Sequence, residues 1–250
     1  MDVVYVDTET TSLREPHLPG GRRTWEVALI RVPGDGTPAR AAWLQIIDVD
    51  LADADPESLR VGRFHERWGK ETTGDVVYGE LEGQTEAFRH FDEKAGEEQQ
   101  GQVTWPLRTK RVTLQRVPEA HAAKVIEEFT RDGAILAGSN PAFDAANFAD
   151  ILRRYQLPAT WYYKPRDVTG IIAGRLRAAV ELGQPDTSPD RDGWSAPSYP
   201  TSVLSAAIGE PEPVDRHSAW ADATWMRRLD AIGRGVPLTP AGDQPAPLSA

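Results

Sequence analysis

The sequence predicts an α/β protein built on a mixed five-stranded sheet with helices on both faces. Three strand-like segments, 2–9, 25–32 and 41–48, come first, and turn residues at 20–21 and 33–36 separate them, so an antiparallel three-strand meander is expected. After Pro118 helix-like and strand-like segments alternate, which is typical of α/β units. The meander and the α/β units are therefore expected to share one sheet.

The first strand is expected at the centre of that sheet, because residues 3–6 are apolar on both faces. In the second half, Pro118 suits a helix N-terminus, and Ala122, Val125, Ile126 and Phe129 form one apolar stripe. The remaining expected elements are a strand at 134–137, a helix over about 144–155, a short strand at 161–163 and a helix from about Asp167.

Three segments fit this pattern less well. Residues 68–116 are polar and weakly periodic, apart from strand-like fragments at 76–78 and 112–114, and are interpreted as an insertion or lid. Residues 183–200 are rich in Pro, Asp, Ser and Gly and should form a loop. We expect one domain over 1–234, followed by a flexible Pro/Ala-rich tail over 235–250.

The composition limits the function. The 250 residues include no cysteine, which excludes disulfides and thiolate metal sites and favours Mg²⁺ or Mn²⁺ on oxygen ligands. No segment approaches the ~20 apolar residues that cross a bilayer, so a cytoplasmic protein without membrane contact is expected. The net charge of -10 argues against a broad basic surface for nucleic acid, so any such partner must be bound locally.

Four acidic residues stand out by their positions. Asp7 and Glu9 are two apart on a strand, so both carboxylates project from one face. Asp144 and Asp222 each precede an apolar helical stripe, which directs their carboxylates towards the core. The simpler alternatives are a polar strand end for the first pair, which is the commoner reading of an isolated Asp-x-Glu, and a helix N-cap for Asp144.

Together these acids indicate a metal site. Burying an unpaired carboxylate costs on the order of several kcal/mol of folding free energy. A bound cation or an ion-pair partner can offset that cost. Two divalent cations would supply that charge and serve phosphoryl transfer. His217 is expected in the loop before the last helix, where it could accept a proton over the same site.

Three motifs resemble those of the DEDDh family of 3′–5′ exonucleases, which includes the proofreading subunit of bacterial DNA polymerase III, RNase T and oligoribonuclease. They are residues 6–13 (VDTETTSL), 140–144 (NPAFD) and 217–222 (HSAWAD), and their order and separation also match. The resemblance covers about 2–65 and 118–232. It implies a ribonuclease H-like fold, two Mg²⁺ or Mn²⁺ ions, and hydrolysis of terminal phosphodiester bonds of DNA or RNA to nucleoside 5′-monophosphates.

The resemblance also implies a role for each matching residue. Asp7, Glu9 and Asp222 would bind the first metal, Asp7 would also touch the second, and Asp144 would hold the second through water. His217 would be the general base. Those that would contact the terminal nucleotide are Thr10 and Thr11 through backbone groups, Leu13 as a wedge, and Asn140 and Phe143 as parts of the pocket.

Ser12 stands where the family usually has Gly, which would strain the loop if that position required a positive φ. The expected partner is nucleic acid with a free 3′ end, with a single strand favoured; a polymerase or a second copy of the chain are further candidates. Two other functions stay open. One is a non-catalytic nucleic-acid- or polymerase-binding module on an exonuclease fold, and the other is an endonuclease or nucleotide phosphodiesterase on the same metal centre.

Overall fold

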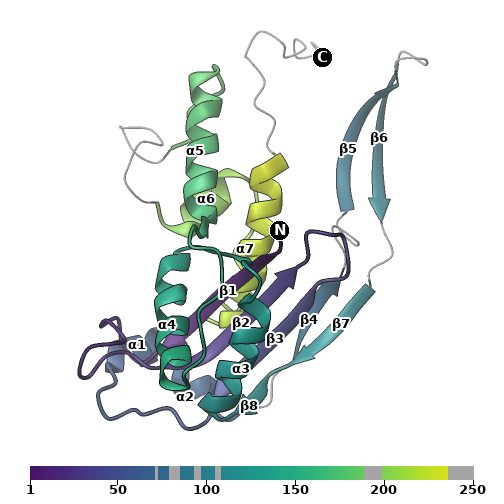
Figure 1. Cartoon of the computed structure of the whole chain (residues 1–250). Coiled ribbons are helices and arrows are strands. Elements are labelled where there is room, and N and C mark those ends of the chain that lie inside the picture. Colours follow the sequence, from purple (N-terminus) through teal and green to yellow (C-terminus); the bar gives the residue numbers. More distant parts are fainter. Residues whose placement is uncertain (71–72, 79–84, 93–96, 105–107, 189–198, 236–250) are drawn as a thin grey trace.

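A six-stranded mixed sheet forms the centre of the protein (Figure 1). The structure is a computed structural model that describes residues 1–70, 73–78, 85–92, 97–104, 108–188 and 199–235. The predicted antiparallel meander is confirmed as β1 (Val3–Thr10), β2 (Thr24–Val32) and β3 (Arg40–Ile46). Next to β1 follow β9 (Ile135–Gly138) and β10 (Arg166–Asp167), both parallel to it, and β8 (Gln115–Val117) pairs parallel with β3.

The sheet differs from the expected one in two strands. The strand predicted at 161–163 is wrong, and β10 takes its place in the sheet. The Tyr162 N–H bonds to the Ala134 carbonyl, and Trp161 packs edge-on against Phe148, so this segment contacts the start of β9 without adding a strand. The sixth strand, β8, forms where the chain returns from the predicted insertion. It was not predicted, because a three-residue strand is too short to show an alternating pattern.

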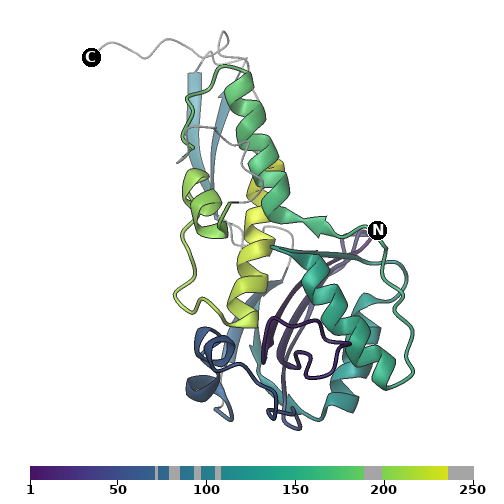
Figure 2. The same cartoon turned by 90° about the vertical axis from the view of Figure 1, so that its left-hand side faces the viewer.

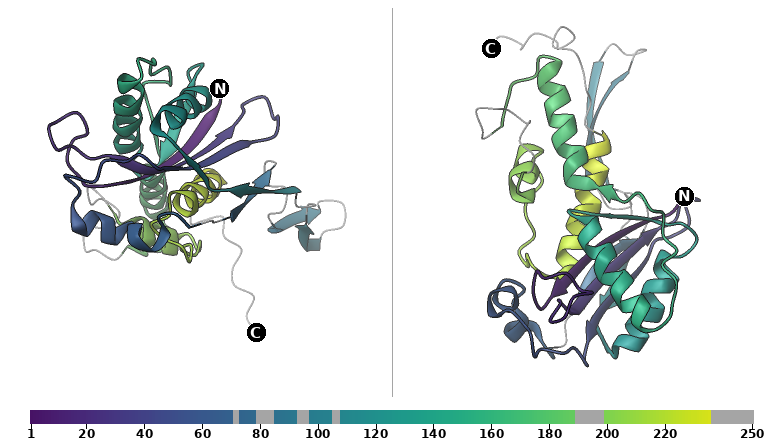
Figure 3. Two further views of the ribbon diagram at one scale, coloured as in Figure 1. Left: turned by 90° about the horizontal axis from the view of Figure 1, so that it is seen from below. Right: turned by 60° about the vertical axis from the view of Figure 1, so that its left-hand side comes forward.

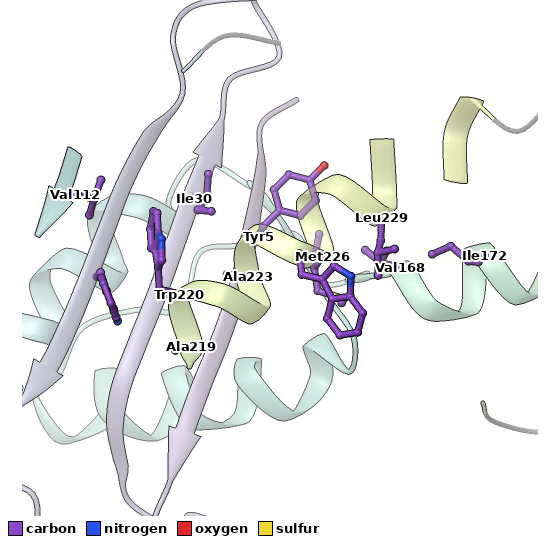
Figure 4. Close-up of a cluster of buried hydrophobic side chains, with 14 of the residues drawn as sticks. Tyr5, Ile30, Val112, Val168, Ile172, Ala219, Trp220, Ala223, Met226 and Leu229 are labelled. Carbon is purple, nitrogen blue, oxygen red and sulfur yellow. The ribbon is translucent and has the colours of Figure 1, made fainter. Parts of the chain in front are cut away.

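Helices cover both faces of the sheet, as Figures 2 and 3 show. On one face α3 (Glu119–Thr130) and α4 (Pro141–Arg154) bury a core that includes Val4 and Val6 of β1. On the other face lie α5 (Val168–Glu181), α6 (Thr201–Ala207) and α7 (Ala219–Gly235). Figure 4 shows Trp220, Ala223 and Met226 of α7 packed against the strands on this second face. The helices predicted near 118, 144 and 167 are therefore confirmed.

Two short helices lie between β3 and the predicted insertion. They are α1 (Pro56–Val61), capped by Asp55, and α2 (Phe64–Arg67), and they pack through Leu59 and Phe64 against Trp25. Neither was predicted, because a helix of four to six residues is too short to show an apolar stripe. None of the helices among the described residues is long and apolar enough to cross a membrane.

The predicted insertion contains two antiparallel ribbons (Figure 1). One pairs β4 (Thr73–Tyr78) with β7 (Arg108–Thr113), and the other pairs β5 (Thr85–Asp92) with β6 (Glu97–Thr104). The fragment expected at 76–78 lies within β4, and the one at 112–114 overlaps the end of β7. The tail over 236–250 and residues 189–198 of the expected loop lie outside the described residues.

The sheet is open on one side of β1. β9 pairs with β1 only as far as Tyr5 and Ala137, so Asp7 and the residues after it have no strand beside them there. β9 ends at Gly138, where a Cβ would lie 3.0 Å from the Val6 carbonyl oxygen, so glycine permits this close approach. The chain then turns into α4, whose first turn occupies the open edge with Asp144.

Candidate metal centre

Three carboxylates meet where β1 faces the start of α7. Ligand atoms of Asp7, Glu9 and Asp222 all lie within 4.8 Å of one another. Asp7 and Glu9 share a face because side chains alternate along β1, and Asp222 lies in the first turn of α7, which packs on that face. The convergence expected from the sequence for these three acids is therefore present in the structure.

These carboxylates repel one another in a partly buried setting. Burial raises the pKa of Asp7 well above its usual range, and Asp144 and then Glu9 add to the effect by charge repulsion. Burial also raises the pKa of Glu9, with Glu26 as the next cause, and Arg67 opposes the shift. Negative charge is thus in excess around Asp7 and Glu9, which is the condition that a bound cation relieves.

Asp222 is only partly satisfied by the protein. Its Oδ2 accepts a 3.0 Å hydrogen bond from the backbone N–H of His217, and Arg216 Nε lies 3.2 Å from its Oδ1. That Oδ1 is buried and has no hydrogen bond of proper geometry within the described residues. Burial raises the pKa of Asp222, and Arg216 is the largest opposing influence. An all-oxygen donor set with an unsatisfied buried oxygen fits a hard divalent cation.

Asp144 reaches this region from the other face of the sheet and lies outside the group of three. It is buried in the first turn of α4, where Asn140 rather than Asp144 is the N-cap, so the capping alternative is wrong. The Thr8 hydroxyl donates a 2.7 Å hydrogen bond to Asp144 Oδ1. Burial raises the pKa of Asp144 to about 7, and the hydrogen bond from Thr8 opposes that rise.

His217 is exposed in the turn immediately before α7, where the sequence predicted it. Its φ of 63° is left-handed, a conformation in which the backbone N–H reaches Asp222. The carbonyl oxygen of His217 accepts a 2.7 Å hydrogen bond from Arg67 Nη1. The backbone of His217 is thus held from both sides, while its imidazole is left at the surface.

A buried ion pair that was not predicted from the sequence lies beside the three acids. Glu26 is paired in register with Glu9, is completely buried, and forms a salt bridge with Arg67 of α2. Trp43 Nε1 and the backbone N–H of Ala219 also donate to Glu26, at 2.8 and 3.2 Å. An acid inside the otherwise apolar segment 25–30 is the signal that could have identified Glu26.

The loop after β1 has a fixed shape. Thr10 Oγ1 donates to the carbonyl of Ser12 at 2.9 Å, and the Thr11 N–H donates to the Arg23 carbonyl at 2.8 Å. Ser12 is not among the residues with positive φ, so serine causes no backbone strain there. Leu13 is 78% exposed at the tip, a position open to a ligand.

The two residues predicted from the second motif lie at the start of α4. Asn140 is exposed as the N-cap residue, although its side chain makes no capping bond. Phe143 is half-buried, and the guanidinium carbon of Arg22 lies 4.0 Å from the centroid of its ring. Both residues therefore lie within one helical turn of Asp144.

No family model matches the sequence, and no curated protein matches it significantly.

Proposed function

We propose that this protein is a two-metal-dependent 3′–5′ exonuclease of the DEDDh type with a ribonuclease H-like fold. It would hydrolyse the terminal phosphodiester bond of DNA or RNA and release nucleoside 5′-monophosphates. The observation that carries the proposal is the approach of Asp7, Glu9 and Asp222 to within 4.8 Å, with Asp144 as the largest charged influence on Asp7. Asp7 and Glu9 come from β1 and Asp222 from α7, and Asp144 of α4 would complete the centre.

The donor set suits two Mg²⁺ or Mn²⁺ ions. Asp7, Glu9 and Asp222 would hold the first, and Asp7 and Asp144 the second. When bound, such a pair supplies positive charge that stabilises the attacking and leaving oxygens of an in-line displacement. Two cations near the first group are shared with other acids, because Arg67 is paired with Glu26 and Arg216 also pairs with Glu212.

The remaining residues have roles in the hydrolysis. The water oxygen forms a bond to phosphorus while the bond from phosphorus to the 3′ oxygen of the preceding nucleotide breaks. His217, held beside Asp222 and exposed to solvent, would accept the water proton. The residues that would contact the terminal nucleotide are Thr10, Thr11, Leu13, Asn140 and Phe143.

The charge of the protein favours a short contact with its substrate. With a net charge of -10, binding would depend on the metals and a few local groups, which fits a single-stranded 3′ end. A polymerase or a second copy of the chain would be a further partner.

The test is digestion of 5′-labelled strands by purified protein with Mg²⁺ or Mn²⁺. Wild type is expected to shorten them from the 3′ end, and Asp7→Ala to abolish the reaction. Asp35→Asn, which removes an exposed acid in the turn after β2, is the matched control and should retain activity. Equal digestion by wild type and Asp7→Ala would overturn the proposal. Matched single-stranded and duplex DNA and RNA identify the substrate, and cleavage of circular strands would indicate an endonuclease.

The second candidate, a non-catalytic binding module, predicts binding of nucleic acid without any metal requirement. The unsatisfied Oδ1 of Asp222 and the repulsion between Asp7 and Glu9 argue against it, because a structural role would not require such charges. Calorimetric titration with Mn²⁺ distinguishes the two, since the module would show no metal binding.

A further inference from the structure

A chain of buried polar side chains leads from the segment before β2 to Asp144. Arg22 Nε donates to Asn147 Oδ1 at 2.5 Å, and Asn147 Nδ2 donates to Thr8 Oγ1 at 2.8 Å. Thr8 Oγ1 in turn donates to Asp144 Oδ1 at 2.7 Å. All four side chains belong to buried residues, with at most 8% of each residue exposed.

The direction of these hydrogen bonds is determined by chemistry. A guanidinium has only donors, so the amide oxygen of Asn147 must face Arg22, and its NH₂ group must face Thr8. The Thr8 hydroxyl accepts that bond, so its own proton is directed to Asp144. When Asp144 is ionised, each bond therefore has one permitted sense, and the chain ends on a carboxylate that accepts.

The position of Thr8 explains why the chain reaches Asp144 and none of the other three acids. Thr8 lies between Asp7 and Glu9 in sequence but projects from the opposite face of β1. On that face α4 supplies both Asn147 and Asp144, one turn apart. One strand thus presents two metal-site acids to α7 and an orienting hydroxyl to α4.

The other end of the chain holds the loop after β1. Arg22 Nη1 donates to the carbonyl oxygen of Arg14 at 2.8 Å and to that of Leu13 at 3.4 Å. The same guanidinium lies over the ring of Phe143. Arg22 therefore contacts two of the places where the terminal nucleotide would bind, as well as Asn147.

We propose that Arg22, Asn147 and Thr8 are positioning residues that fix Asp144 for the second metal ion and connect its orientation to the loop at 10–14. The inference rests on the proposed exonuclease function. It gives a role to three residues to which the family resemblance assigned none. Residues that orient a metal ligand in this way commonly alter metal affinity by about 10- to 100-fold when they are removed.

The test uses matched variants of Thr8 and counts bound Mn²⁺ by electron paramagnetic resonance and calorimetry. Thr8→Val keeps the shape and removes the hydroxyl, and it should weaken the second ion by about 10-fold or more while the first is unchanged. Thr8→Ser keeps the hydroxyl and should retain both binding steps. Asp144→Asn gives the reference for loss of the second ion.

A control on the same strand separates positioning from general stability. The Tyr5 hydroxyl also donates to a buried carboxylate, that of Asp230, at 2.6 Å, and it makes no hydrogen bond to any of the four proposed metal ligands. Tyr5→Phe should therefore lower the free energy of unfolding without changing Mn²⁺ binding. Urea unfolding of each variant without metal confirms that it is folded.

Arg22→Met tests the connection to the loop. It should weaken the second ion and also raise KM for a labelled strand, whereas Thr8→Val should act mainly through the metal, with its defect reduced at high Mn²⁺. If Thr8→Val binds two ions like wild type while Asp144→Asn does not, the positioning role is overturned and the exonuclease proposal stands. If wild type binds no Mn²⁺, both proposals fall.

Discussion

Arg67 holds His217 by its backbone, through a 2.7 Å hydrogen bond from Nη1 to the carbonyl oxygen. Nη2 of the same guanidinium pairs with Glu26 and donates to Ser218 Oγ at 3.0 Å. A residue of the short helix α2 thereby connects β2 to the turn that carries the expected general base. The contact fixes the backbone from which the exposed imidazole projects.

Arg67→Met should be strongly destabilising, because it leaves Glu26 buried without its cation. Breaking a buried pair from one side costs about 3–5 kcal/mol. Glu26→Gln combined with Arg67→Met should lose less than the sum of the single variants, since no unpaired charge remains. A double-mutant cycle from urea unfolding of the metal-free protein measures this, and additive losses would show that the pair is not coupled.

Gly62→Ala should impair metal binding without changing any charge. A Cβ at position 62 would lie 2.9 Å from Glu9 Oε2 and 3.2 Å from Trp25, so the Glu9 carboxylate would have to move. Gly174→Ala is the matched control, because a Cβ there meets no atom within 4 Å and alanine favours a helix by about 0.5–1 kcal/mol. Equal Mn²⁺ affinity in both variants would contradict this reading of Gly62.

Without metal, the free energy of unfolding should fall as the pH rises from about 4 to above 7. Asp7, Glu9 and Asp144 have pKa values that are higher in the folded protein than the unfolded values of about 4. The folded state therefore binds more protons in this window, and stability is lost as the groups ionise. Thermal unfolding with EDTA and with Mn²⁺ should show a stabilisation by metal that is larger at pH 8 than at pH 5.

Asp7→Asn should stabilise the metal-free protein while it abolishes exonuclease activity. The substitution removes one of several like charges without changing the shape of the side chain, so repulsion on Glu9, Asp144 and Asp222 decreases. The thermal midpoint in EDTA should rise at pH 8 and change little at pH 4, where the carboxyl is already protonated. A lower midpoint at pH 8 would show that Asp7 has a stabilising role of its own.

The alternating and helical periods of the sequence predicted the parts of the fold that are long and regular. The meander and α3, α4 and α5 are confirmed, because each buries a stripe that the sequence displays. The aromatic segment 161–163 misled the prediction, since Trp161 packs on Phe148 and no strand forms. Strands of two or three residues, such as β10 and β8, depend on pairing across the sheet and leave no local period.

The approach of Asp7, Glu9 and Asp222 was predictable because the strand period puts the first two on one face and Asp222 precedes an apolar helical stripe. The residues that orient them were not, since they are set by contacts between distant segments. Arg22 and Asn147 are separated by 125 positions, and Arg67 and His217 by 150. Polar residues of this kind look like ordinary surface residues until the packing is known.

The side chains of Asp7 and Glu9 project from the face of β1 that is covered by α7, and the side chain of Thr8 projects from the face covered by α4. The two proposed ion positions are consequently supported by separate hydrophobic layers, one under α7 and one under α4. Substitutions that loosen the packing of α7 would alter the first ion, and substitutions beneath α4 the second. This separation would allow substitutions to remove the proposed second ion while the proposed first ion stays in place.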